Sequence, residues 1–190
     1  MNNIDLIGDD ACVKQLLTDD FSNTNGVYID DGVEKIGEYA FNGCSNLTSV
    51  DLPAVTNIGS NAFASCTNLT SVNLPAVTNI GSNAFQSCSN LTSVNLPAIT
   101  SIVGTYVFSS CSKLTSLILR KSDSICTLSN INAFKNTPIK SGTGYIYVPR
   151  ALVDTYKAAS NWSTYANQFR ALEDYTVDGT ISGALDPSKI

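Results

Sequence analysis

The 190-residue chain has no histidine, one methionine and one tryptophan, and its middle carries almost no charge. Without histidine, neither a Ser–His–Asp triad nor a Cys–His pair can form, and a zinc site loses one of its usual ligand types. Between Leu47 and Cys111 the single charged residue is Asp51. A partner that touches this stretch would meet neutral hydrogen-bonding groups, so salt should matter little to that contact.

Other catalytic patterns are missing as well. Neither a G-x-x-x-x-G-K-[ST] phosphate loop nor a G-x-G-x-x-G turn occurs. General acid–base catalysis needs two titratable groups that converge in a pocket. Neighbouring acidic residues here fit turns and helix ends instead; they are Asp9 and Asp10, Asp19 and Asp20, Asp30 and Asp31, and Glu173 and Asp174. We therefore predict no catalytic residues, no metal and no cofactor, and expect that the protein is not an enzyme.

Membrane-spanning and nucleic-acid-binding signals are also missing. No apolar run reaches the roughly 18 residues that a transmembrane helix needs, and Met1–Asp5 lacks the basic and apolar regions of a signal peptide. The net charge is −5 and no Lys/Arg cluster could neutralise a row of phosphates. We expect no membrane insertion and no nucleic-acid partner, while location inside or outside the cell stays open.

The chain does contain a repeat. Three phrases follow one another, two of 22 residues (Cys44–Ser65 and Cys66–Ser87) and one of 23 (Cys88–Ser110). A period in this range is typical of stacked units that share one core. The repeat is marked by a phenylalanine in each unit: Phe41, Phe63, Phe85, Phe108 and Phe134. The sequence therefore predicts an α/β solenoid built around a parallel β-sheet.

One repeat unit predicts the path of one coil. In Leu69–Pro75, Val72 and Leu74 alternate with polar residues, as in a strand with one buried side. Val77–Gly81 is expected to turn the chain. Ser82–Cys88 then fits a single helical or 3₁₀ turn. A coil is thus predicted to run strand, turn, short helical turn and return.

Degenerate copies extend the array at both ends. Val27–Ile29 is expected to be the first strand and Tyr145–Pro149 the sixth. Exposed solenoid ends need covering, and helical patterns occur at Asp10–Asp19, Arg150–Ala159 and Trp162–Ala171. The predicted division is a helical cap at residues 1–26, a solenoid of about five to six coils at 27–149, and a helical cap with a tail at 150–190.

Four cysteines recur with the repeat, each three residues after its phenylalanine: Cys44, Cys66, Cys88 and Cys111. We interpret them as a column of small, buried, reduced thiols rather than as disulfide partners.

Asparagine also recurs with the repeat. Asn46, Asn68 and Asn90 each begin a glycosylation sequon, as does Asn161. Because three of the four sequons arise from the repeat itself, a stacked asparagine column that bonds the backbone is the favoured interpretation. Glycosylation is the alternative.

These motifs resemble the BspA-like bacterial leucine-rich repeat proteins. The resemblance covers about Val27 to Pro149 and implies a right-handed leucine-rich-repeat superhelix in a surface or secreted protein that binds host proteins, glycans or cells. It brings no catalytic motif. Ile102–Phe108 has an insertion and Leu117–Arg120 lacks the proline, so local geometry there is open. The phrases that carry the resemblance are Leu47–Pro53 with Ile58–Phe63, Leu69–Pro75 with Ile80–Phe85, and Leu91–Pro97.

The outward residues of the predicted strands are the candidate contact surface. Columns of hydroxyls and amides could hydrogen-bond an extended polar chain, although the same residues also suit a solvated sheet without a ligand. The columns contain no aromatic residue in this interpretation. We predict a monomeric, non-enzymatic module of a cell-surface or secreted adhesion protein with a protein or glycan partner; the alternative is a structural spacer. The candidate residues are Thr48, Ser49, Asp51, Thr70, Ser71, Asn73, Thr92, Ser93, Asn95 and Ser116.

Overall fold

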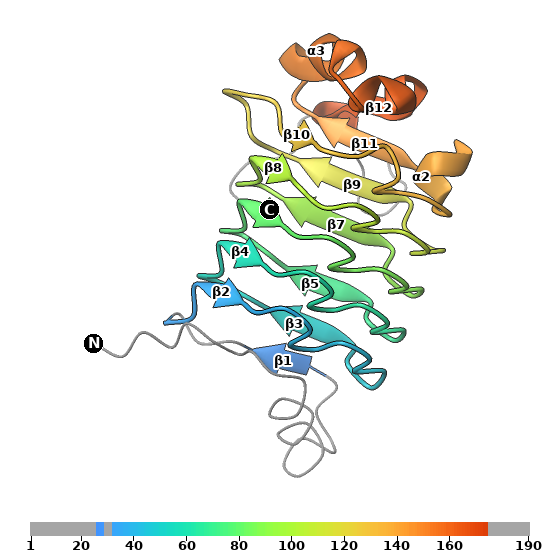
Figure 1. Ribbon diagram of the computed structural model, residues 1–190. Coiled ribbons are helices and arrows are strands. Elements are labelled where there is room, and N and C mark those ends of the chain that lie inside the picture. Colours follow the sequence, from blue (N-terminus) through green and yellow to red (C-terminus); the bar gives the residue numbers. More distant parts are fainter. Residues whose placement is uncertain (1–25, 29–31, 175–190) are drawn as a thin grey trace.

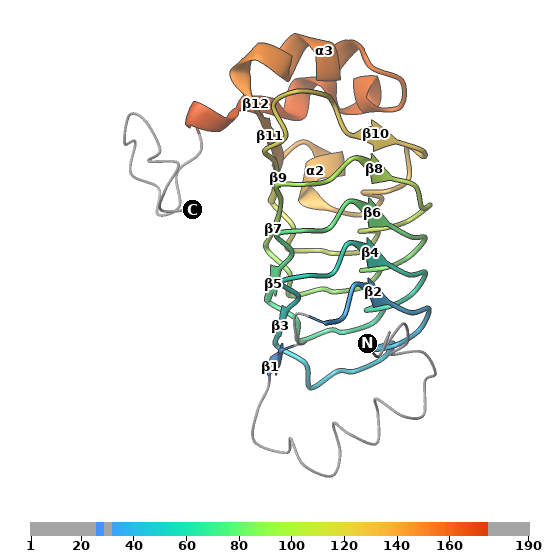
Figure 2. The same cartoon turned by 90° about the vertical axis from the view of Figure 1, so that its left-hand side faces the viewer.

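The computed structural model describes residues 26–28 and 32–174, which form a solenoid of stacked coils with two parallel sheets on opposite sides (Figures 1 and 2). The larger sheet is made of β1 (Gly26–Tyr28), β3 (Ser49–Asp51), β5 (Ser71–Asn73), β7 (Ser93–Leu96), β9 (Ser116–Leu119), β11 (Tyr145–Val148) and β12 (Phe169–Ala171). The smaller sheet is made of β2 (Lys35–Ile36), β4 (Asn57–Ile58), β6 (Asn79–Ile80), β8 (Ser101–Ile102) and β10 (Thr127–Leu128). The predicted solenoid, with its first and sixth strands, is confirmed.

Equivalent residues of successive coils pair with one another. Ser49 lies beside Ser71 and Asp51 beside Asn73, and the paired strands of the described residues are all parallel. In the larger sheet β1-β3-β5 and β7-β9-β11-β12 are each continuously paired, and β5 lies next to β7 (Figure 1). Because identical positions stack, each side chain of the repeat becomes a column along the solenoid.

The second sheet was not predicted. The segment expected to turn the chain, Val77–Gly81, contains β6, which pairs with β4 and β8. Each strand of this sheet is only two residues long, with its second residue buried, as Ile58 and Ile80 are. A two-residue strand is too short to show an alternating pattern in the sequence, which is why it was read as a turn.

The core is a stack of phenylalanine rings. Phe41, Phe63, Phe85, Phe108 and Phe134 lie nearly parallel, with centroids 5.0, 5.3, 5.5 and 5.5 Å apart. Each ring is at most 1% exposed. A fully buried Phe contributes about 1.5–3 kcal/mol by burial alone, and centroid distances of this size fit favourable ring contacts. The stack therefore ties every coil to the next.

The segment predicted to be a helical turn is not helical. Ser82–Cys88 forms consecutive tight turns, in which Gln86 N–H donates to the Asn83 carbonyl (3.0 Å) and Cys88 N–H to that of Phe85 (3.3 Å). Asn83 and Ser87 have φ of 57° and 60°. Two residues in the left-handed region interrupt a helix, and small polar residues tolerate that region best.

The thiol column is confirmed. Cys44, Cys66, Cys88, Cys111 and Cys126 are all buried and reduced. Three thiols donate to the carbonyl of a phenylalanine one coil earlier: Cys66 to Phe41 (3.0 Å), Cys88 to Phe63 (3.2 Å) and Cys111 to Phe85 (3.0 Å). Burial raises the pKa of Cys66 to about 12, and that of Cys126 also to about 12. The thiols of Cys66 and Cys126 therefore stay protonated at neutral pH.

Short helices follow the last coils. α2 (Pro138–Ser141) precedes β11; η1 (Arg150–Leu152) and α3 (Val153–Ala158) match the helix predicted over Arg150–Ala159. None of the helices among the described residues is both long and apolar enough to cross a bilayer. The helix predicted at Asp10–Asp19 lies outside the described residues.

The helix predicted over Trp162–Ala171 is only partly present. η2 (Trp162–Gln168) is a 3₁₀ helix interrupted at Tyr165, and β12 replaces the expected last turn before η3 (Leu172–Asp174). Phe169 and Ala171 are buried while Arg170 is exposed, so the local period is two rather than 3.6. Trp162 and Tyr165 close the Phe stack, with centroids 6.1 and 5.4 Å from that of Phe134.

Candidate ligand-binding face

Seven of the ten predicted contact residues lie in the strands of the larger sheet, and Thr48, Thr70 and Thr92 each come one residue before a strand; the seven are Ser49, Asp51, Ser71, Asn73, Ser93, Asn95 and Ser116. β3 and β7 turn their apolar residues inward, as Val50 and Val94 show, and their polar residues outward. The pairing register places Ser93 beside Ser116 and Asn95 beside Ile118. Strands in a sheet lie about 4.8 Å apart, so paired serines such as Ser93 and Ser116 repeat a hydroxyl at about that spacing.

Amides of the face are already engaged with their neighbours. Asn73 Nδ2 donates to Asp51 Oδ1 at 2.7 Å. Arg120 Nε donates to Asn95 Oδ1 at 3.0 Å. These contacts fix the rotamers of Asn73 and Asn95, so the amide column is ordered before any ligand arrives.

Two threonine hydroxyls of the neighbouring column, those of Thr70 and Thr115, bond the backbone. Thr70 Oγ1 donates to the Thr48 carbonyl (3.0 Å), and Thr115 Oγ1 to that of Thr92 (3.3 Å). The serine hydroxyls differ, because they make no hydrogen bond within the described residues. The face therefore offers its hydrogen-bonding capacity through the serine column: Ser49, Ser71, Ser93 and Ser116.

The columns also contain aromatic residues, contrary to the sequence-based interpretation. Tyr145 pairs with Ser116, and Tyr147 pairs with Ile118 on one side and Arg170 on the other. The sequence does contain a signal for this arrangement, because tyrosines and aliphatic residues alternate along Tyr145–Val148. Continuing the columns into the predicted sixth strand places both tyrosines on the face. Tyr156 and Trp162, by contrast, are 0% and 1% exposed and pack inside the protein.

Ile118 differs from the other members of its column. It occupies an outward position between Asn95 and Tyr147 yet is only 4% exposed. It is not part of the continuous inner core, to which its neighbours Leu117 and Leu119 belong. The outer face thus has a small apolar centre of its own beside the two tyrosines.

The asparagine column lies apart from this face and bonds the backbone, as predicted. Asn68 Nδ2 donates to the Ser45 carbonyl at 2.8 Å, and Asn90 Nδ2 to the Thr67 carbonyl at 2.9 Å. Asn90 Oδ1 accepts a hydrogen bond from Lys113 Nζ at 2.7 Å. These amides fasten one coil to the preceding one.

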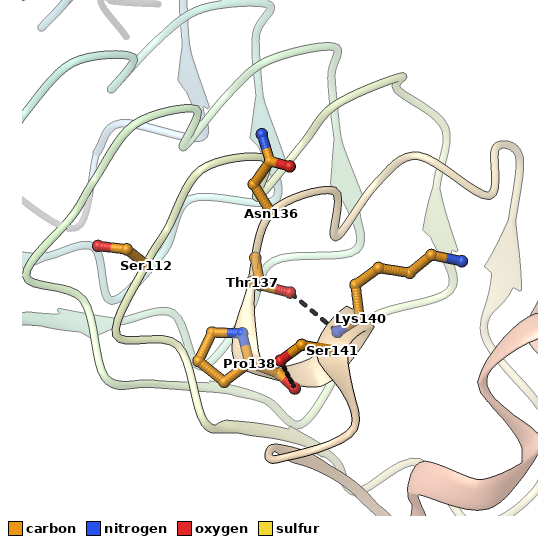
Figure 3. A pocket seen from close by; sticks show the side chains of 6 residues that line it. All are labelled: Ser112, Asn136, Thr137, Pro138, Lys140 and Ser141. Atoms are coloured by element: carbon orange, nitrogen blue, oxygen red, sulfur yellow. Dashed lines mark hydrogen bonds between the residues drawn. The ribbon is translucent and has the colours of Figure 1, made fainter.

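A shallow pocket of about 380 Å³ lies beside α2 (Figure 3). Its walls come from hydroxyls, an amide and a proline, and Thr137 Oγ1 accepts the Lys140 N–H (3.2 Å) as the helix cap. Nothing in its walls pairs a nucleophile with a base. The lining residues are Ser112, Asn136, Thr137, Pro138, Lys140 and Ser141.

Metal-ligating side chains do not converge in the part of the chain that the structure describes. Within residues 26–28 and 32–174, no three His, Cys, Asp or Glu side chains could hold an ion together. Three of the buried thiols, those of Cys66, Cys88 and Cys111, each bond a backbone carbonyl as described above.

Solved structures of bacterial leucine-rich repeat proteins share this fold. A T. pallidum leucine-rich repeat protein is 28% identical, with 65% of this chain and 57% of that one covered and a TM-score of 0.55. One from Eubacterium ventriosum is 30% identical (66% and 32% covered, TM-score 0.54). A leucine-rich cell surface protein from Faecalibacterium prausnitzii is 25% identical (77% and 38% covered, TM-score 0.50). The match spans between about a third and just over half of these proteins.

Comparison with curated proteins gives no match. The family described as BspA type leucine-rich repeat region matches residues 19–140 in six copies. Those residues include the stacked phenylalanines, the thiol column and most of the strands of both sheets. The chain therefore belongs to the BspA-type leucine-rich repeat family.

Proposed function

We propose that the chain is a non-enzymatic binding module whose outer sheet face recognises a protein or a glycan, as part of a bacterial cell-surface or secreted adhesion protein. The observation that supports this proposal is the serine column, in which hydroxyls without partners among the described residues lie in register in two pairs, Ser49 beside Ser71 and Ser93 beside Ser116. An extended polar ligand could bond several of them at once. Among the described residues, no helix lies over the outer side of β3, β5 and β7 (Figure 2).

The surface location rests on a relative. The Faecalibacterium prausnitzii protein, 25% identical, is described as a cell surface protein. A neutral face between Leu47 and Cys111 also suits recognition that must work at varied ionic strength, because screening acts on charges.

The test is a binding array of host proteins and glycans, probed with the wild-type chain and with Ser71→Arg/Ser93→Arg. Arginine at these positions would fill the face with bulk and charge, so a bound array component should be lost. Ser101→Arg is the matched control, since Ser101 is a half-buried strand serine on the opposite sheet. Equal loss in the control, or unchanged binding in the double variant, would count against the face.

A spacer without a ligand of its own is the second candidate. The observation in its favour is that outward groups of the middle coils bond the neighbouring coil, as the Thr70 hydroxyl and the Asn73 amide do, and need no ligand. Absence of binding to every array component would favour this alternative.

A further inference from the structure

The outer face changes its chemistry at its C-terminal end. From β3 to β7 its columns hold Ser, Asp and Asn, while on β11 and β12 the same columns hold Tyr145, Tyr147 and Arg170. We call these three residues, with Ile118, the aromatic patch. Its members come from three adjacent strands, so the patch is set by the sheet and not by a loop.

The aromatic patch is ordered by its own contacts. The rings of Tyr145 and Tyr147 meet edge to face, with centroids 6.4 Å apart and planes at 69°. The Arg170 guanidinium lies 4.4 Å from the Tyr145 ring centroid. Its Nη1 donates to the carbonyls of Asn167 (2.9 Å) and Phe169 (2.8 Å). A stacked, backbone-anchored arginine loses little side-chain freedom when a partner binds.

The positive charge of Arg170 is available to a partner. Two of its contacts are to neutral carbonyls and one is to a ring, and none of the ion pairs within the described residues includes it. A guanidinium can present a planar fork to a carboxylate. The group best matched to this position is therefore a carboxylate of a partner.

The surrounding charge has the same sign. Residues 113–174 contain eight Lys and Arg against four Asp and Glu, although the whole chain is acidic. Residues 34–112 contain one Lys against three acidic residues. A partner with an acidic surface would be drawn to the C-terminal end of the face and not to the other end.

We propose that the aromatic patch is the anchor point for an acidic protein partner, which then extends along the serine column; this inference rests on the proposed function. Tyr and Arg are the residues most enriched at the centres of protein interfaces. The two tyrosines supply contact area, and Arg170 supplies the charge for a Glu or Asp carboxylate.

The experiment measures binding of the purified chain to an immobilised copolymer of glutamate and tyrosine, with alginate as the acidic glycan and poly-L-lysine as the opposite charge. We expect binding to the copolymer alone. Arg170→Gln and Tyr145→Ala should each weaken it by about tenfold, and Arg170→Lys by less, because charge stays while the fork is lost. Binding should weaken as NaCl rises from about 50 to about 200 mM.

The matched control is Tyr106→Ala. Tyr106 also lies under a cation, with Lys135 Nζ 5.7 Å from its ring centroid, but outside the strands of the face. Its removal should leave binding unchanged. Each variant is first shown by circular dichroism to melt as the wild type does, and Arg170→Gln, at an exposed position, keeps the test valid should Tyr145→Ala misfold.

Several outcomes overturn the inference. One is wild-type-like binding by Arg170→Gln, and another is alginate binding as tight as copolymer binding, which would make the partner a glycan. No binding of the wild type to the copolymer overturns it too. An array ligand lost in Ser71→Arg/Ser93→Arg but retained in Arg170→Gln would leave the proposed function standing without an anchor at the aromatic patch.

Discussion

The coils around Phe63 and Phe85 and those around Phe108 and Phe134 share one interior and differ on the outside. Ring centroids stack at 5.3 Å in the first pair and 5.5 Å in the second. Outside, β5 carries the exposed Ser71 and Asn73, while β9 carries an outward residue that is buried. The inner columns are therefore constrained by stacking, whereas the outer columns can change without cost to the fold.

The largest effects should come from the shared interior. Phe85→Ala and Phe134→Ala should each lower the free energy of unfolding by about 3–5 kcal/mol, since both rings are fully buried between ring neighbours. Urea denaturation followed by circular dichroism measures the loss. Thr92→Ala, at an exposed position, is the control and should change stability by less than about 0.5 kcal/mol.

A clear difference between the two phenylalanine variants would break the comparison. If Phe134→Ala cost far less than Phe85→Ala, the last coils would not share the interior of the regular ones. The contacts of Trp162 and Tyr165, which border Phe134, would then stabilise the C-terminal coils without the phenylalanine stack.

Glycines test how closely the coils approach. A Cβ on Gly104, in the coil with the insertion, would lie 2.4 Å from Ser82 N and Cα, and one on Gly81, in a regular coil, 2.9 Å from Ser60 N. Gly104→Ala should therefore cost about 1–3 kcal/mol, and Gly81→Ala somewhat less. Thermal melting measures both. Gly32→Ala, where nothing lies within 4 Å, is the matched control.

The reverse order of these glycine effects would show that the inserted coil is looser than its neighbours. Near-equal effects at Gly104 and Gly32 would do the same, because only close backbone contact separates the two positions.

Most of the fold follows from the repeat, because a column position needs the same residue in each coil. Phe63, Cys66 and Leu69 are therefore visible as a period in the sequence. The two-residue strand at Asn79–Ile80 was missed, since it pairs only with copies of itself one coil away and has no local pattern. The sequence predicts a helical turn at Asn83 and Ser87 because φ > 0 is rarely signalled by a residue other than glycine.

Less of the candidate site could be predicted. The serine and asparagine columns were found because they repeat, as Ser71 and Ser93 do. Tyr145 and Arg170 were not assigned to the face, since each occurs once and its column is defined by register rather than by period. Arg170 in particular lies in a segment with a helical pattern, and only the structure shows that it joins the sheet.

The free energy of unfolding at alkaline pH should depend on the buried thiols of both regions. The folded pKa of Cys66 is raised to about 12 by burial, as is that of Cys126, from an ordinary value of 9.0. The unfolded thiols ionise first, so this contribution is intact below pH 9 and is lost as pH rises towards 12. Each thiol should lower the free energy of unfolding by roughly 1 kcal/mol at pH 10.

Urea denaturation between pH 7 and 11 measures this slope, with Cys66→Ala and Cys126→Ala compared with wild type. Each variant should lose stability less steeply above pH 9. Tyr156, whose pKa burial raises to about 12, adds a loss that begins near pH 10 and is common to all three chains. An unchanged slope in both variants would mean that these thiols are solvated in the native protein.

The smallest losses of stability should come from the asparagine column, which includes Asn90 at the boundary between the regular coils and the irregular ones. Asn68→Ala removes the 2.8 Å bond to the Ser45 carbonyl, and Asn90→Ala the 2.9 Å bond to that of Thr67. Each should cost about 0.5–1 kcal/mol in urea denaturation. Asn90 also loses Lys113, but an exposed bond of this kind adds little. A much larger loss at Asn90 would show that Lys113 fastens the two regions together and that their boundary, rather than either stack, limits the stability of the solenoid.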